Sequence, residues 1–525
     1  MRKIGIMMSV LALCGGTAFS QSQLDAFRYS QTELSGTARY LGMGGAFGAL
    51  GGDISAMNTN PAGLAVYHSS EIVTTFSLSA VNAKSDWLGN KVDEGKNTFS
   101  FDNIAYVGYF PTGNDEGLVS WNVGFSYNRV KNYRRNYTLN TAGNLHTSLS
   151  DYTALRSYGL PAADLASSDG YNPYENPNIG DWLSILSFQG GYTVPANNEG
   201  NVYSSAFYDP ATQEFLNLEG AELRVSEWGS IDKYNMAFGL NISEMFMFGA
   251  DVSITDLKYE YESRYDEGFT RNSNLYLDNY LKTDGTGYSF NIGAIVRPVD
   301  FLRLGVAYNS PVWYKMTDYY QGHAGTDIPF LDDPKLDAST PKGVYDYEYR
   351  SPDKWLFSAA AIFGTVGLIS VDYELTNYKN MRMYQTDGSS NLVTNEDISN
   401  NFKMGNTIRV GAEFKPTPQF AVRAGVAYSD SPLKDPIKNG DIEIATVGTI
   451  PHFTIYKGTT SYTVGLGYRF TPNFYTDLAC VIGSYKEDAY IFSNMIEDGE
   501  KLMEAQPATL KNNTTRVALT LGYKF

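Results

Sequence analysis

Residues 517–525 of the chain read VALTLGYKF and alternate between two kinds of side chain. Every second residue from Val517 to Phe525 is Val, Leu, Tyr or Phe, and the residues between them are Ala, Thr, Gly and Lys. Successive side chains of a β-strand point to opposite faces, so one face of this strand is apolar and the other is small or polar. Such a strand is typical of a transmembrane β-barrel, whose outer face meets lipid. The pattern therefore predicts an all-β fold, a transmembrane antiparallel barrel.

The same alternation recurs from Glu71 onward, for example over residues 121–127, 288–296 and 462–470. Six short turns separate seven long polar connections, and thirteen connections join about fourteen strands. An even number of strands places both termini of the chain on the periplasmic side, with the long loops outside. We place the turns at 111–117, 241–244, 298–300, 364–367, 416–419 and 471–473, and the long connections near 81–97, 135–228, 262–275, 310–353, 380–404, 429–451 and 486–511.

One uncharged stretch tests the barrel interpretation. No charged residue occurs between Lys354 and Asp372, and this length approaches that of a transmembrane helix. Gly364 and Gly367 divide the stretch in half, so we predict two strands joined by a short turn.

Several charged residues fall on the inward face of the predicted strands. Charges of both signs are expected to pair along a solvated wall, to line a wet channel, or to hold something placed in the lumen. These residues are Asp251, Arg297, Arg303, Arg409, Glu413, Arg423, Arg469, Asp477 and Arg516.

The first twenty residues resemble a secretory signal peptide. Arg2 and Lys3 precede an apolar run, and Ala18-Phe19-Ser20 provides small residues at both cleavage-site positions. We expect cleavage before Gln21, so residues 1–20 are assigned as signal peptide. The alternative is a lipoprotein signal through Cys14, although Leu13 is large for that motif.

Composition limits the partners and the chemistry. The chain has 50 Gly, 40 Tyr and 28 Phe, and its net charge of −17 disfavours a nucleic-acid partner. Removal of residues 1–20 leaves Cys480 as the one cysteine, which excludes an intrachain disulfide. The four histidines form no recognisable catalytic constellation, and for Tyr67-His68 we expect a solvated histidine, the alternative being an axial haem ligand. We expect no enzyme activity, no cofactor and no metal.

Residues 21–70 do not alternate and are rich in glycine. A dinucleotide-binding loop does not fit, since Gly42-x-Gly44 requires a third glycine where Phe47 stands. The segment is too small to form a core of its own, so we expect it to lie in the lumen as a plug (hatch), ahead of a barrel over residues 71–525. The residues expected to pack closely against the wall are Gly42, Gly44, Gly45, Phe47 and Gly48.

The motif Asn60-Pro61-Ala62 stands just before the first predicted strand, and residues 39–53 form a second, looser match. A small-residue plug that ends in this motif, before a fourteen-stranded barrel, resembles the FadL/TodX family of outer-membrane transporters. The sequence of residues 39–64 most resembles that of family members from the Bacteroidetes. The terminal Phe525 resembles the signal read by the barrel assembly machinery.

The resemblance implies passive transport of small hydrophobic molecules, fatty-acid-like or aromatic, across the outer membrane of a Gram-negative bacterium. It also implies a plug gated at Asn60, Pro61 and Ala62, and lateral exit into membrane lipid through a gap in the wall. The alternative is a FadL-like barrel that acts as an interaction scaffold or secretion-accessory protein.

The connection over residues 135–228 is longer than the family leads us to expect. Within it, residues 181–188 predict a short helix capped by Asp181. Trp182, Ile185 and Leu186, with Phe188 beside them, are candidates for an extracellular site that captures a hydrophobic ligand. The alternative is a loop that packs on its own small core.

Overall fold

The computed structural model describes residues 22–143 and 145–525. The predicted signal peptide, residues 1–20, and the alternative lipid attachment at Cys14 both lie outside the described residues.

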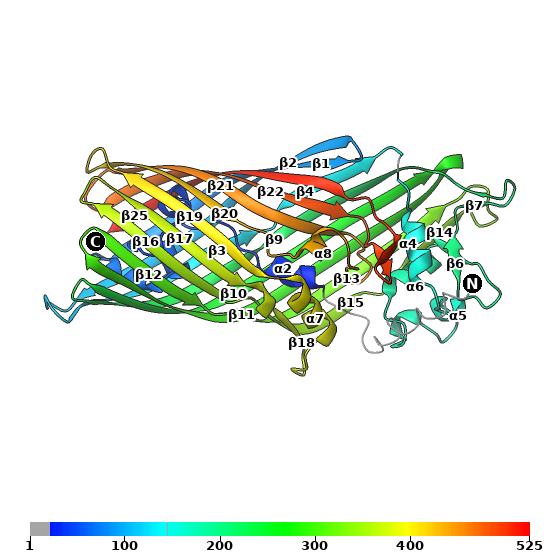
Figure 1. Cartoon of the computed structure of the whole chain (residues 1–525), viewed down its shortest axis with the longest axis horizontal. Helices are drawn as coiled ribbons and strands as arrows, with labels where there is room; N and C mark the ends of the chain where they lie inside the picture. Colours follow the sequence, from blue (N-terminus) through cyan, green and yellow to red (C-terminus); the bar gives the residue numbers. More distant parts are fainter. Residues whose placement is uncertain (1–21, 144) are drawn as a thin grey trace.

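Fourteen antiparallel strands form a closed barrel (Figure 1), which confirms the predicted fold class and strand count. The last strand pairs with the first from Glu71 and Lys524 to Asp86 and Thr509, and this pairing closes the wall. In order around the wall, the strands are β1 (Glu71–Trp87), β2 (Asn90–Pro111), β3 (Leu118–Asn132), β9 (Leu218–Ile242), β10 (Phe246–Phe269), β11 (Ser273–Val299), β12 (Leu302–Asn309), β16 (Lys354–Phe363), β17 (Gly367–Asn377), β19 (Met404–Phe414), β20 (Phe420–Ser429), β21 (Phe453–Arg469), β22 (Phe474–Tyr490) and β25 (Ala508–Lys524).

The outer face of the wall is apolar near the end that carries the short turns. In β25, Val517 is 42% exposed whereas Ala518 is fully buried, as the alternation predicts. Tyr234, Tyr288 and Trp313 lie in one register row across neighbouring strands and are exposed on the outside. Aromatic residues at this position mark the border between lipid and water.

All six predicted short turns are present, and residues 354–372 form β16 and β17 with a turn between them, as predicted. No helix in the described residues is long and apolar enough to cross a membrane.

Two of the predicted long connections are wrong. Strands β1 and β2 continue through residues 81–97 to a tight turn at Leu88 and Gly89, and β10 and β11 continue through residues 262–275. The outer side chains of these stretches are polar because they lie beyond the lipid, and a polar strand is easily mistaken for a loop. The wall therefore extends well past the membrane.

The other long connections carry short elements of their own. They are β4 (Arg135–Thr141), α4 (Leu149–Arg156), α5 (Ala162–Leu165), η4 (Pro173–Glu175), α6 (Trp182–Gln189), β5 (Thr193–Pro195), β6 (Tyr203–Ser205), β7 (Tyr208–Asp209), β8 (Glu214–Phe215), β13 (Trp313–Asp327), β14 (Lys335–Ser339), β15 (Gly343–Arg350), η6 (Tyr378–Asn380), β18 (Arg382–Gln385), α7 (Leu392–Asn401), α8 (Asp435–Lys438), β23 (Met495–Glu497) and β24 (Glu500–Met503). The turn between β10 and β11 is η5 (Thr270–Asn272).

Residues 22–70, which we call the N-terminal segment, run through the inside of the barrel (Figure 1). The segment contains α2 (Gln23–Ser30), α3 (Ala38–Gly42) and the 3₁₀ helices η2 (Ile54–Asn58) and η3 (Pro61–Val66). Most of its side chains are buried, so the lumen is filled near the end with the short turns.

Candidate functional site

The N-terminal segment bonds to inward-facing groups on distant parts of the wall. The amide of Ala38 donates to Thr520 Oγ1 of β25 at 2.7 Å. Asn122 of β3 donates through Nδ2 to the carbonyl of Leu64 at 2.6 Å. These contacts fix the segment at several points around the lumen, because a buried polar group that loses its partner costs free energy.

The Asn60-Pro61-Ala62 motif forms the start of η3 and lies against the wall. Asn60 Oδ1 accepts a hydrogen bond from the amide of Ala62 at 3.1 Å, which caps the helix. Asn60 Nδ2 donates to the carbonyl of Gly48 at 2.6 Å and is 3.4 Å from the carbonyl of Ala294 in β11. The motif thus joins two parts of the segment to each other and to the barrel.

Glycines allow the backbones of the segment and the wall to meet. A Cβ on Gly42 would lie 3.0 Å from Cα of Gly465 in β21. Gly44 has φ of +62°, and a Cβ there would lie 2.9 Å from the amide nitrogen of Val426. Only glycine fits both the conformation and the space at Gly44.

The rest of the glycine-rich run folds around Asp372, an inward-facing residue of β17. The amides of Phe47 and Gly48 both donate to its carboxylate at 3.0 Å. Gly45, by contrast, packs within the segment, where an added Cβ would lie 2.6 Å from Leu34. Gly42, Gly44, Phe47 and Gly48 therefore contact the wall directly, and Gly45 shapes the segment itself.

A cluster of ion pairs joins α3 to the part of the wall near the short turns. Arg39 Nε lies 3.2 Å from Glu413 Oε2, and Arg423 Nε donates to the same oxygen at 2.7 Å. Arg423 also pairs with Asp477 at 2.5 Å, and Lys415 lies 3.2 Å from Glu413. Three of these residues were among the predicted inward charges, so the predicted mutual pairing is present, with Arg39 of the segment as an additional member.

A cavity of about 290 Å³ lies between the segment and the wall, on the side of this cluster that faces the long connections. Leu24, Phe27, Leu34 and Tyr40 of the segment form an apolar part of its lining. The lining also has six basic and four acidic side chains: Arg28, Lys131, Arg134, Arg135, Arg409 and Arg516, with Glu33, Glu227, Asp430 and Glu487. A cavity with apolar and cationic walls suits a molecule that has an apolar body and an anionic end.

Arg409 lines this cavity and has one donor without a partner among the described residues. Its Nη2 donates to Glu374 at 2.9 Å, whereas its Nη1 is buried without a hydrogen-bond partner among the described residues. A buried unsatisfied donor is uncommon in proteins and points to a missing acceptor.

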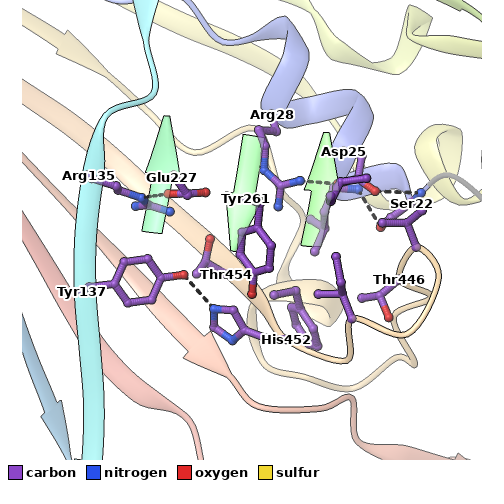
Figure 2. Close-up of a pocket in the computed structure, with 15 residues that line it drawn as sticks. Ser22, Asp25, Arg28, Arg135, Tyr137, Glu227, Tyr261, Thr446, His452 and Thr454 are labelled. Carbon is purple, nitrogen blue, oxygen red and sulfur yellow. Dashed lines mark hydrogen bonds and ion pairs between the residues drawn. The ribbon is translucent and has the colours of Figure 1, made fainter. Parts of the chain in front are cut away.

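Figure 2 shows a second, much smaller cavity of about 30 Å³ beside α2. Arg28 pairs with Asp25 within the helix, and Arg135 pairs with Glu227 on β9. Arg135 is also 2.5 Å from Glu487 on β22, so this arginine links two separate parts of the wall. The two cavities share Leu24, Arg28, Arg135, Glu227 and Thr454 in their linings.

His452 borders the smaller cavity (Figure 2). Its Nδ1 lies 2.6 Å from the carbonyl of Tyr490, which only accepts, so Nδ1 carries the proton. Nε2 then accepts from the hydroxyl of Tyr137 at 2.7 Å. Burial lowers the pKa of His452 to about 4, so the side chain is neutral near pH 7.

One part of the barrel wall lacks a backbone ladder. The ladder between β2 and β3 ends at the pair Asn103 and Asn128, and residues 90–102 have no ladder partner on that side in the described chain. Side chains bridge the strands there, for example Asn132 Nδ2 and Ser100 Oγ at 3.2 Å. We name this place the β2/β3 seam. The larger cavity reaches it, since Thr98 and Asn132 are part of the lining.

The predicted helix in the longest connection is α6, and Asp181 is its N-cap as predicted. Trp182, Ile185 and Leu186 are at most 5% exposed and pack in the main apolar core. The ring of Phe188 is partly buried and lies 5.9 Å from that of Tyr203. These four residues do not line either cavity described above, so ligand capture by them stays a prediction.

Residues 145–217, which we call the cap, are held to the wall at Glu267 of β10. Its carboxylate accepts from the hydroxyl of Ser148, the amide of Leu149 at 2.8 Å and the hydroxyl of Tyr265 at 2.6 Å. It therefore lies at the N-terminus of α4. Burial raises the pKa of Glu267 to about 7.

Phe525 lies beside the start of the barrel. Its amide donates to the carbonyl of Ser70 at 3.0 Å, and its exposed ring stacks near Tyr106 at 6.2 Å. Its role in assembly stays a prediction.

Sequence reasoning did not identify Asp372, Asn122 or the seam. Asp372 falls on the inward face of its strand, as the predicted inward charges do. The alternation of inward and outward residues along the strand is therefore the signal that would have identified it. The seam has no local signal, because it depends on which strands pair.

Comparison with known proteins agrees with this architecture. Residues 234–525, more than half of the chain, match the family model described as outer membrane protein transport protein (OMPP1/FadL/TodX). The chain is 24% identical over 250 residues to a 47 kDa outer membrane protein of Pasteurella multocida (strain Pm70), which covers 47% of the chain and 52% of that relative. The chain thus spans about half the length of the curated relative it matches.

Among solved structures, a Pseudomonas aeruginosa FadL homologue is similar with a TM-score of 0.53 at 15% identity, over 94% of this chain and 99% of that one. The P. putida toluene transporter TodX gives a TM-score of 0.47 at 12% identity, again over 94% and 99%. The first similarity supports the fold.

Proposed function

The chain belongs to the outer membrane protein transport family (OMPP1/FadL/TodX), and we propose that it conducts hydrophobic molecules passively across the outer membrane, where it resides. The observation that carries the proposal is the cavity of about 290 Å³ between the N-terminal segment and the wall. Each methylene favours apolar surroundings by about 0.8 kcal/mol, so a partly apolar route suits such a molecule better than a water-filled pore.

The preferred substrate is fatty-acid-like, with an anionic head group. Arg409 Nη1 provides a buried donor without a partner among the described residues, and the cavity has more basic than acidic side chains. A carboxylate would accept from Arg409, and the apolar part of the lining would receive the chain. A neutral aromatic molecule would leave that donor unsatisfied.

Uptake measurements test this preference. Cells that produce Arg409→Gln should take up a long-chain fatty acid more slowly than the parent, whereas toluene uptake should be unchanged. Arg469→Gln, an exposed residue at the end of β21, is the control. Equal loss of both substrates would reject the anionic head group. Uptake no higher than in a deletion strain would reject transport and leave the interaction-scaffold alternative.

The N-terminal segment acts as a plug that gates this route, and the substrate leaves sideways through the β2/β3 seam. Two features support this proposal. The segment fills the lumen on the short-turn side of the cavity, which obstructs a straight path, and the cavity borders a stretch where side chains bridge two strands in place of a backbone ladder.

A reversible cross-link tests the exit. Ser100→Cys with Asn132→Cys, in a Cys480→Ser background, places two thiols across the seam, because the native side chains are 3.2 Å apart. Oxidation should reduce uptake, and a reductant should restore it. The control pair is Ser253→Cys with Ser289→Cys, whose hydroxyls are 2.7 Å apart across paired strands β10 and β11. Unchanged uptake after oxidation at the seam would exclude exit there.

A further inference from the structure

Three lysines form a row across neighbouring strands on the outside of the barrel. Lys486 of β22 is in register with Lys511 of β25, and Lys511 is in register with Lys84 of β1. All three side chains are exposed. Lys84 is six residues from Leu78, and Lys511 is six residues from Val517, so both lie on the same outer face as these lipid-exposed residues.

This row is unusual in its charge. Like charges directly opposite each other destabilise a sheet. Lys84 has an acidic partner, Asp93 of β2, at 2.8 Å. Lys486 and Lys511 form no ion pair within the described part of the chain. The chain as a whole has a net charge of −17, so its overall composition does not account for a cationic row.

On the opposite side of the barrel, two lysines of β10 and β11 have acidic partners in register. There, Lys282 of β11 is in register with Glu260 of β10, and Lys258 of β10 is in register with Asp284 of β11. Each lysine thus faces an acid, which stabilises the bare protein. In the row formed by Lys84, Lys486 and Lys511, which we call the lysine row, Lys84 faces Asp93, whereas Lys486 and Lys511 have no acid in register among the described residues and are open to an anion from outside the chain.

The position of the lysine row indicates which anion that is. Six residues of strand span ~20 Å, and the tilt of barrel strands reduces this to ~15 Å along the membrane normal. Asn82, Asn513 and Ser484 lie in register between the row and the apolar surface, so the outer face changes from apolar to polar to cationic. Lysine side chains reach back toward the interface with their flexible stems. The long-loop end faces outward in such barrels.

We propose that the lysine row binds the phosphate groups of phosphorylated glycolipid in the outer leaflet of the outer membrane. The row continues the lipid-facing surface of β22, β25 and β1, and its charge complements the phosphates. This inference depends on the membrane location and not on the transported molecule.

Lipid binding to the full chain in detergent tests the proposal, with bis-phosphorylated lipid A as the probe and native mass spectrometry as the readout. The triple variant Lys84→Gln, Lys486→Gln, Lys511→Gln should bind the probe at least about tenfold more weakly than the parent. Dephosphorylated lipid A should bind weakly and equally to both proteins. The control variant Lys258→Gln, Lys282→Gln, Lys315→Gln removes three lysines from the opposite wall, of which Lys258 and Lys315 are exposed and Lys282 is half-buried, and should bind as the parent does.

Folding of the variants is checked by heat-modifiable mobility on gels. Removal of the lysine row should also raise the thermal midpoint of the lipid-free barrel, because it removes repulsion between adjacent strands. Parent-like binding by the triple variant, equal weakening in the control, or equal binding of dephosphorylated lipid A by the parent would each overturn the proposal.

Discussion

Arg39 Nε lies 3.2 Å from Glu413 Oε2, so an ion pair joins the N-terminal segment to wall strand β19. The Glu413 side chain is fully buried and also contacts Arg423 and Lys415 of the wall. The segment is therefore held by a carboxylate that keeps two other cationic partners when Arg39 is removed. This arrangement allows the segment to be loosened while the barrel stays intact.

Arg39→Gln should increase ion conductance through the assembled barrel. The change removes the ion pair and the hydrogen bond from Arg39 Nη1 to the carbonyl of Gly52 at 3.0 Å. We expect the segment to lose about 1–3 kcal/mol of binding, less than for an isolated buried pair, because Glu413 keeps its other partners. Planar-bilayer recordings measure the conductance. Lys415→Gln removes another partner of Glu413 and leaves the segment in place, so it should conduct as the parent does.

Gly249→Ala should displace the Asn60-Pro61-Ala62 motif. A Cβ on Gly249 of β10 would lie 2.2 Å from the carbonyl carbon of Pro61, which is far inside contact distance. Gly268→Ala is the control on the same strand, since a Cβ there meets nothing within 4 Å. We expect both variants to assemble, and only Gly249→Ala to raise conductance and expose the segment to protease. Parent-like conductance of an assembled Gly249→Ala protein would show that this contact does not hold the segment closed.

Alternation along single strands was sufficient to predict the barrel, the fourteen strands and the six short turns. It also placed Arg423, Glu413 and Asp477 on the inner face, where they pair. The helix after Asp181 followed from its capping residue and its apolar face. These features depend on neighbouring residues, so a local pattern is enough to find them.

The features that the sequence did not reveal depend on distant contacts. Asn60 is 3.4 Å from the carbonyl of Ala294, a contact across more than two hundred residues that has no local signature. The β2/β3 seam depends on β4 pairing with β9, and β2 continues past it with the same alternation as elsewhere. Burial of Trp182 likewise follows from the way the cap folds onto the wall.

Asn60→Ala should loosen η3. The side chain is fully buried, and its loss leaves the carbonyl of Gly48 and the amide of Ala62 without these partners. Such a loss costs about 1–3 kcal/mol. Hydrogen exchange of residues 61–66 should therefore speed up by at least about fivefold, on a scale where 1.4 kcal/mol is tenfold. Asn58→Ala is the control, because Asn58 Oδ1 has no hydrogen-bond partner in the described chain. Unchanged exchange in Asn60→Ala would contradict the capping role.

Docking of the cap onto the wall should weaken as pH rises. Burial raises the pKa of Glu267 to about 7, above the ordinary value of 4.5, and release of α4 would return the carboxyl to water. Between these two values the docked state binds more protons than the released state, so docking is strongest below pH 4.5 and is weakened once pH exceeds 7. The full difference amounts to roughly 3 kcal/mol.

Hydrogen exchange of residues 149–156 at pH 5 and pH 8, corrected for intrinsic rates, measures this effect. The parent should lose protection at pH 8, and Glu267→Gln, which has no titratable proton, should be protected equally at both values. Glu262→Gln, an exposed residue on the same strand, should behave as the parent does. The Glu267 carboxylate also accepts three hydrogen bonds, which favour its ionised form. If those bonds outweigh burial, protection of α4 in the parent will rise with pH, and the expected weakening of docking will be contradicted.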